Sequence, residues 1–120
     1  MASVLVVDDE ELIRWSLAQT LEAAGYEVLE AGSARETLER LHQASDISVV
    51  LLDVKLPDSS DLGLLRTLRQ QAPGCRIILM TAHGTAETLE EALRAGAFRA
   101  LGKPFDMGNM VGLVNAAAAA

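Results

Sequence analysis

Aromatic residues and cysteines are scarce in this chain, and its apolar runs are short. Its 120 residues include two phenylalanines, one tyrosine and one tryptophan, so a core must be built mainly from aliphatic side chains. The single cysteine, Cys75, excludes an internal disulfide and suggests a reducing compartment. No apolar run reaches membrane-spanning length, and the N-terminus lacks the basic start of a signal peptide. We therefore expect a cytoplasmic protein without a membrane partner.

Basic residues are also few. Ten lysines and arginines stand against 17 acidic residues, which gives a net charge of -7. Direct, non-specific binding of nucleic acid needs clustered basic residues, so we do not expect it. Apolar residues are plentiful at 50%, enough for one core, and the length suits one domain. We place that domain at residues 1–115. Residues 116–120 form an alanine-rich tail, which is a helix end, the start of a linker or a cloning scar.

Short apolar runs alternate with stretches of helical period along the whole chain. The pattern predicts strands at 3–7, 26–31, 47–52, 76–80 and 98–102, and helices at 10–24, 33–44, 61–71, 85–95 and from 105 onwards. The strands are apolar on both faces, which is typical of a parallel sheet covered by helices on both sides. The expected fold class is therefore α/β, a three-layer sandwich around a five-stranded parallel sheet.

Two of the expected helices carry clear local signals. Ile13, Leu17, Leu21 and Ala24 share one face of the first helix, which should face the core, and Gly25 should end that helix. In the second helix Ser33 is a good N-cap residue, and the glutamate three positions later completes a capping-box pattern.

Polar side chains stand at the ends of four expected strands. Asp8 and Asp9 follow the first strand, Asp53 the third, Thr81 the fourth and Lys103 the fifth. In open parallel sheets, ligands bind beyond the carboxyl ends of the strands. We therefore expect these five side chains to meet in one crevice.

Three carboxylates in one crevice repel each other unless one takes up a proton or a cation neutralises them. Mg²⁺ suits the second possibility because it prefers oxygen ligands and phosphate oxygens. Lys103 would add a compact positive charge, and Thr81 a hydroxyl donor. Such a group can stabilise a phosphoryl group on an aspartate, which is able to act as the nucleophile of the transfer.

Each of these residues also has an ordinary structural explanation. Asp8 or Asp9 could cap the following helix, and Asp53 could be a residue at the start of a loop. Thr81 and Lys103 could be plain strand-end residues. The functional interpretation is favoured because all five occur together at the ends of strands.

Five short segments follow one another along the chain, namely VLVVDDE, VVLLDVKLPD, ILMTAHG, GAF and GKPF. Each is weak alone, but in this order, around the strand ends, they are specific. Over essentially its whole length the chain resembles the receiver domain of two-component response regulators. The resemblance implies a flavodoxin-like sheet in which the strands, counted along the chain, lie in the order 2-1-3-4-5.

The resemblance also implies site roles. Asp53 would accept a phosphoryl group from the phosphohistidine of a sensor histidine kinase, so the chain would not be an enzyme beyond this chemistry on itself. Asp8 and Asp9 would form the acidic Mg²⁺ pocket with Asp53, and the Lys55 backbone carbonyl would be a further ligand.

For the remaining strand-end residues, the resemblance implies a switch between two states. Thr81 would be the switch hydroxyl and Lys103 the amine that pairs with the phosphate. The bond from Lys103 to Pro104 is cis in this family.

The segments IRWSL and TAHGT look most like the nitrogen-regulation subgroup, whose receivers precede a sigma-54-activating ATPase and a DNA-binding domain. We therefore expect an output domain outside this chain and a possible homodimer; a stand-alone regulator is the alternative. In the family, kinase helices dock on a face that would here contain Arg14, Trp15 and Ala18. Packing of Trp15 against a neighbouring element is the other explanation.

The sequence departs from the family pattern at two positions. Asp61 stands where the family usually has a glycine, so the loop geometry there is expected to change. Ala100 replaces the usual tyrosine or phenylalanine, whose ring turns inward when the switch operates. Signalling without that ring would pass through the fourth helix and backbone shifts, or through dimerisation.

Two other classes of protein use a similar fold or a similar set of site residues. A phosphatase with an aspartate nucleophile would also combine a carboxylate, Mg²⁺ and a lysine, but it typically needs a second aspartate at position 55, which is lysine here. A flavin-binding module would need a phosphate-cradling loop after the first strand, where this chain has Asp8, Asp9 and two glutamates.

Overall fold

The computed structural model describes residues 3–44, 46–59, 61–82 and 84–120, in which five strands alternate with five helices. The strands are β1 (Ser3–Val7), β2 (Glu27–Ala31), β3 (Ile47–Asp53), β4 (Arg76–Thr81) and β5 (Arg99–Gly102). The helices are α1 (Glu11–Ala23), α2 (Ala34–Gln43), α3 (Gly63–Gln71), α4 (Ala86–Arg94) and α5 (Met107–Ala119). Neighbouring strands pair in parallel in the order β2-β1-β3-β4-β5, which confirms the expected sheet.

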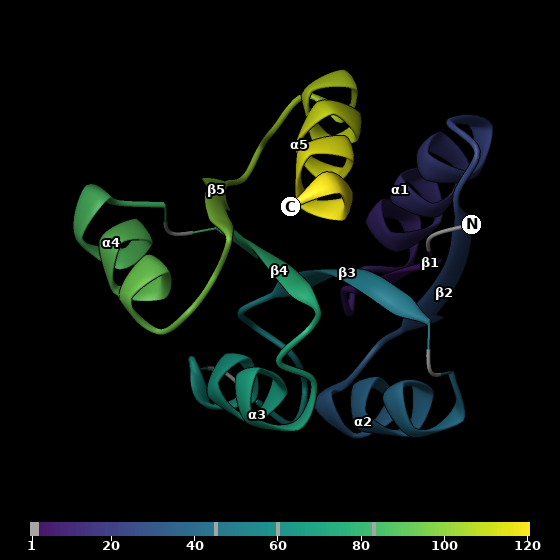
Figure 1. Ribbon diagram of the computed structural model, residues 1–120. Helices are drawn as coiled ribbons and strands as arrows, with labels where there is room; N and C mark the ends of the chain where they lie inside the picture. The colour runs from purple at the N-terminus through teal and green to yellow at the C-terminus, as the bar shows by residue number, and fades with distance from the viewer. Residues whose placement is uncertain (1–2, 45, 60, 83) are drawn as a thin grey trace.

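Helices cover both faces of the sheet (Figure 1). The purple α1 and the yellow α5 lie on one face, where Leu17, Leu21, Met110 and Val114 pack onto β1, β3 and β4. The helices α2 and α3 lie on the other face, and α4 stands beside β5 at the edge of the sheet. The largest fully buried side chains are all leucine, isoleucine or methionine, as the scarcity of aromatic residues requires. Burial of each such side chain contributes about 1.5 to 3 kcal/mol.

Local signals place several helix ends where the sequence predicts them. Gly25 follows α1 with φ of 99°, a conformation that glycine adopts at low cost. The Ser33 side chain accepts the N–H of Glu36 at 3.1 Å, which confirms the predicted cap of α2. The Glu36 carboxylate accepts the N–H of Gly32 at 2.7 Å, one residue earlier than in a standard capping box.

The α1 stripe was predicted correctly except at its last member. Leu17 and Leu21 are buried and Ile13 is half-buried, but Ala24 is exposed. Ala18 is buried instead, which removes it from the expected kinase-docking face. Trp15 remains 55% exposed, so it does not pack into a neighbouring element.

The start of α3 differs from the prediction by two residues. The Asp61 carboxylate accepts the N–H of Gly63 at 2.8 Å, and the helix begins only at Gly63. No described residue other than glycine has a positive φ. Asp61 therefore stands in place of the family glycine without a strained backbone.

The alanine-rich tail continues α5 as far as Ala119. Ala117 is 1% exposed and packs with Met110 and Val114 against the sheet. Part of the tail therefore belongs to the core, while the division of the chain at residue 115 stays a prediction. Across the described residues, none of the helices combines the length and apolar character that crossing a membrane requires.

Candidate functional site

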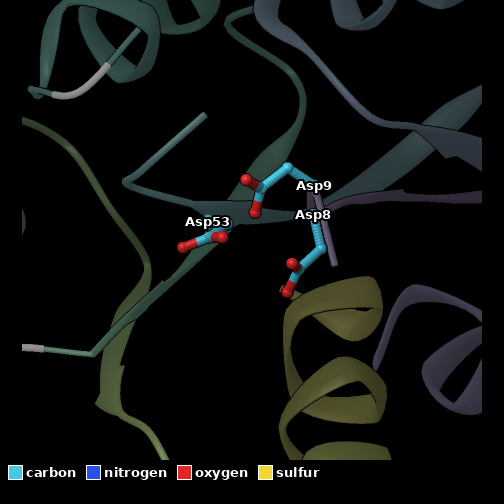
Figure 2. Close-up of side chains that lie close together, drawn as sticks. All are labelled: Asp8, Asp9 and Asp53. Carbon is cyan, nitrogen blue, oxygen red and sulfur yellow. The ribbon is translucent and has the colours of Figure 1, made fainter. Parts of the chain in front are cut away.

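The carboxyl edge of the sheet brings the five predicted residues to one place. Asp8 and Asp9 follow β1, Asp53 ends β3, Thr81 ends β4, and Lys103 follows β5. Because the strands are parallel, their carboxyl ends lie at the same edge, and the loops that follow them lie next to one another. Figure 2 shows the three carboxylates grouped where β1 and β3 end.

Asp8 is fully buried and makes two interactions with its carboxylate. Its Oδ1 accepts the N–H of Glu10 at 2.9 Å, just before α1 begins. Its Oδ2 accepts from the Lys103 ammonium at 2.9 Å. The N-cap of α1 is Glu10, which has no side-chain capping hydrogen bond, so helix capping explains neither Asp8 nor Asp9. The Asp8 carboxylate instead braces the turn before the helix and forms an ion pair with Lys103.

Asp53 is also buried, and its carboxylate has weaker partners. Its Oδ1 lies 3.4 Å from the N–H of Lys55, and its Oδ2 lies 3.4 Å from Lys103 Nζ. Burial and the nearby charge of Asp8 raise the pKa of the Asp53 carboxyl from 3.8 to about 6, although Lys103 opposes this shift. With a pKa of about 6, the carboxyl begins to take up a proton when the pH falls only slightly below neutral, and an added cation would favour its charged form.

Asp9 is exposed and completes a group of three carboxylates. One oxygen from each of Asp8, Asp9 and Asp53 lies within 4.8 Å of the others (Figure 2). Oxygen atoms at this spacing fit a hard divalent cation such as Mg²⁺, which takes oxygen ligands at about 2.0 to 2.1 Å. The residues present therefore match the metal that the family pattern implies.

Lys103 is the cation of the site, with its side chain only 12% exposed. Besides Asp8 and Asp53, its ammonium lies 3.6 Å from Glu10 Oε1. Burial alone would lower the pKa of Lys103, but the hydrogen bond to Asp8 and the three acidic neighbours raise it above its ordinary value. The bond to Pro104 is cis, as expected.

The end of β5 is joined to the end of β4 through the backbone. The N–H of Lys103 donates to the carbonyl of Thr81 at 2.7 Å, and Thr81 itself is buried. Gly84 and Gly102 touch through their backbones, because a Cβ built on Gly84 would lie only 2.5 Å from the Gly102 Cα. A movement of the Thr81 loop therefore has a direct steric path to β5 that needs no side chain at Ala100, which is half-buried.

The loop after Asp53 is fixed by contacts that the sequence did not reveal. Leu56 and Ser59 pair through two backbone hydrogen bonds of 2.7 and 3.2 Å, and Leu56 is buried. The Asp58 carboxylate accepts the N–H groups of Ala34 and Arg35 at 2.7 and 3.1 Å, which caps α2 from a distant loop. Asp58 in a turn is an ordinary sequence signal, and nothing in it indicates the partner helix.

Other candidates stand apart from this site. His42 is exposed, as expected. His83, considered as a loop residue after Thr81, lies outside the described residues. Cys75 is buried, and burial raises the pKa of its thiol, so the structure gives it no reactive character.

Comparisons with known proteins agree with this fold. The family model described as "Response regulator receiver domain" matches residues 4–115. The DNA-binding transcriptional regulator NtrC of Azospirillum brasilense is 38% identical over 116 residues, covering 97% of this chain. The regulatory protein AtoC of Escherichia coli (strain K12) is 38% identical over 106 residues, covering 87% of this chain.

Solved structures show the same architecture. A response regulator receiver domain protein from Clostridium thermocellum superposes with a TM-score of 0.91 at 33% identity, covering 99% of this chain and 95% of that one. The receiver domain of NtrX from Brucella abortus gives a TM-score of 0.88 at 31% identity, covering 97% of this chain and 98% of that one. The chain belongs to the response regulator receiver domain family, and its resemblance to the nitrogen-regulation subgroup is confirmed.

The chain spans only a fraction of its curated relatives. It covers 24% of the NtrC protein of Azospirillum brasilense and 22% of AtoC. The receiver is therefore one part of those regulators.

Proposed function

We propose that this receiver is a phosphorylation-operated switch in which Asp53 accepts a phosphoryl group from the phosphohistidine of a sensor histidine kinase. Asp8, Asp9 and Asp53 would hold Mg²⁺ together with the Lys55 backbone carbonyl. The convergence of three carboxylates beside Lys103 is the observation that carries this proposal.

The chemistry follows from the environment of Asp53. A carboxylate oxygen of Asp53 attacks the phosphorus, the P–N bond to the imidazole breaks, and the imidazole leaves as the neutral ring, keeping the proton already on its other nitrogen. The attacking oxygen must be unprotonated, so the raised pKa of Asp53 makes the reaction depend on the cations around it. When bound, Mg²⁺ supplies the positive charge that draws phosphate oxygens and the acidic side chains together.

Lys103 and Thr81 would then bind the product. The Lys103 ammonium lies 3.4 Å from Asp53 Oδ2 and is shared with Asp8, so a phosphoryl group on Asp53 would compete for it. A phosphoryl group carries a charge of about -2 and three acceptor oxygens, which favours Lys103 and the Thr81 hydroxyl as partners. The contact between Gly84 and Gly102 would pass the resulting loop movement to β5.

The output is proposed from the relatives. The NtrC proteins are named as DNA-binding transcriptional regulators, and the chain covers only their receiver portion. We infer that this receiver controls an output part with a sigma-54-activating ATPase and a DNA-binding domain in the cytoplasm, and that phosphorylation acts through a homodimer or through that output part. The exposed Trp15 on α1 would contact the kinase when the two proteins dock.

Phosphorylation from a small-molecule donor tests the first step without the kinase. The chain is incubated with acetyl phosphate and Mg²⁺, and its intact mass is followed against time. We expect a gain of one phosphoryl group per chain, none for Asp53→Ala, and none for the wild type in excess EDTA.

Two results would count against the proposal. An equal mass gain in Asp53→Ala would place the phosphoryl group elsewhere. Continuous release of phosphate at many turnovers per chain would favour the aspartate-nucleophile phosphatase over a switch that is labelled stoichiometrically.

A further inference from the structure

The Arg14 guanidinium bridges the loop of the acidic pocket and the edge strand of the sheet. Its Nη1 donates to the backbone carbonyl of Asp8 at 2.9 Å, and its Nε donates to Glu30 Oε1 on β2 at 3.1 Å. The side chain is only 21% exposed, although its neighbour Trp15 on the same helix points to solvent. Arg14 is therefore turned toward the pocket loop and away from the expected docking face.

The surroundings leave room for this side chain. A Cβ built on Gly32 would lie 3.0 Å from Arg14 Nη1 and 3.3 Å from Glu36 Oε1, so a larger residue would press on both. The Glu36 carboxylate meanwhile accepts the Gly32 N–H at 2.7 Å, which fixes the backbone that borders the guanidinium. The end of β2 and the start of α2 thus pack closely around the Arg14 guanidinium.

We propose that Arg14 is a positioning residue for the acidic pocket: by holding the Asp8 carbonyl, it fixes the loop that presents Asp8 and Asp9 to the metal. The proposal rests on the proposed function, because it concerns the same Mg²⁺ site. The Asp8 carboxylate has partners of its own in Glu10 and Lys103, but the exposed Asp9 depends on the backbone of its loop. A guanidinium reaches two acceptors in fixed directions, which the single ammonium of lysine does not.

Whether the Arg14 variants bind Mg²⁺ more tightly or more weakly distinguishes a positioning role from an effect of charge alone. Arg14 carries a positive charge close to a cation site, so if charge were its only influence, Arg14→Gln would strengthen Mg²⁺ binding and Arg14→Lys would leave it unchanged. If Arg14 positions the loop, both variants weaken binding. Residues that orient metal ligands typically change metal affinity about 10- to 100-fold when they are replaced.

The experiment measures Mg²⁺ binding by calorimetry on the purified chain, at a temperature where circular dichroism shows each variant fully folded. We expect Arg14→Lys and Arg14→Gln to bind Mg²⁺ about 10-fold more weakly than the wild type. In EDTA, amide hydrogen exchange at Asp9 and Glu10 should be faster in both variants, which reports the loop without any metal. Should Arg14→Lys fail to fold, Glu30→Gln tests the same bridge by weakening its anchor on β2.

Arg40→Gln is the matched control. Arg40 donates to the backbone carbonyl of Glu30 at 3.1 Å, so this variant removes the same charge and a similar contact without touching the Asp8 loop. Its Mg²⁺ affinity should stay within about twofold of the wild type, far from the change expected at Arg14. Unchanged or tighter binding in Arg14→Lys, with binding intact in the wild type, would overturn the positioning proposal alone. Absence of Mg²⁺ binding in the wild type would overturn the proposed function, and the positioning proposal with it.

Discussion

The Lys103 ammonium lies 2.9 Å from Asp8 Oδ2, so the residue after the last strand neutralises the carboxylate after the first. The same ammonium is 3.4 Å from Asp53 Oδ2 and serves both buried carboxylates at once. One cation shared by two acids leaves a deficit of positive charge. The protein can correct that deficit by protonating Asp53 or by binding a metal ion.

Removal of the shared cation should destabilise the metal-free protein. We expect Lys103→Ala to lower the free energy of unfolding by about 3 kcal/mol at pH 7.5, because it leaves the buried Asp8 carboxylate without its partner. Urea denaturation in EDTA measures this, and added Mg²⁺ should restore part of the loss. The exposed Arg66→Ala, which also removes one positive charge, should change stability by less than about 0.5 kcal/mol. Equal effects in the two variants would contradict a specific role for Lys103.

Asp53 should make stability depend on pH. Its pKa is about 6 in the folded chain against an ordinary 3.8, so its contribution to stability is present below about pH 4 and is lost as the pH rises through 6. Asp53→Asn cannot ionise. In EDTA the free energy of unfolding of this variant should therefore be higher than that of the wild type by on the order of 2 to 3 kcal/mol at pH 7.5, and equal to it at pH 4.

Urea unfolding of both proteins from pH 4 to 8 tests this prediction. The informative quantity is the difference between them, since other titrating groups are common to both. Saturating Mg²⁺ should stabilise the wild type more than the variant and shrink the gap. A difference that does not vary with pH would mean that the folded carboxyl ionises as it does in the unfolded chain.

The backbone contact between the β4–α4 loop and β5 should tolerate no added methyl group. Gly84→Ala places a Cβ 2.5 Å from the Gly102 Cα, so the loop must shift, at an expected cost of about 1 to 3 kcal/mol. Gly112 in α5 has no atom within 4 Å of its built Cβ, and Gly112→Ala should instead stabilise the chain by up to about 1 kcal/mol. Thermal unfolding compares the pair, and a stabilised Gly84→Ala would show that the contact is not tight.

Asp58 should hold the start of α2 across the loop that follows Asp53. We expect Asp58→Ala to speed amide hydrogen exchange at Ala34 and Arg35, the two N–H groups that its carboxylate accepts. These backbone hydrogen bonds hold the pKa of Asp58 below its ordinary value, so the contact is present at neutral pH and is lost as the pH falls through that lowered pKa. Asp58→Asn, which keeps one acceptor oxygen, should retain partial protection. Unaltered exchange in Asp58→Ala would mean that the cap adds nothing.

The sheet and the site were predictable from the sequence because both depend on period and position. Apolar runs that alternate with helical stretches specify a parallel sheet, and the end of each strand specifies one edge. Asp8, Asp53 and Lys103 therefore meet where their places at strand ends put them. Their metal ligation and phosphate roles go beyond this geometry and stay predictions.

Features that depend on three-dimensional neighbours were missed. The inward turn of Arg14 follows from a glutamate on β2, and the cap by Asp58 joins residues 24 positions apart, which no local pattern reports. The exposed Ala24 and buried Ala18 reflect how α1 is rotated against the sheet. The helical period determines which residues share a face, but it fixes the margins of the buried face only to within about one residue.

The partners Asp8 and Lys103 are 95 positions apart; β1 ends just before Asp8, and the other four strands lie between the two residues. On the proposed function, a nascent chain emerging from the ribosome would lack a complete acceptor site until the last strand has been made and inserted. Translation products that end before Lys103 would then be inactive in signalling, since they lack the ammonium that pairs with Asp8.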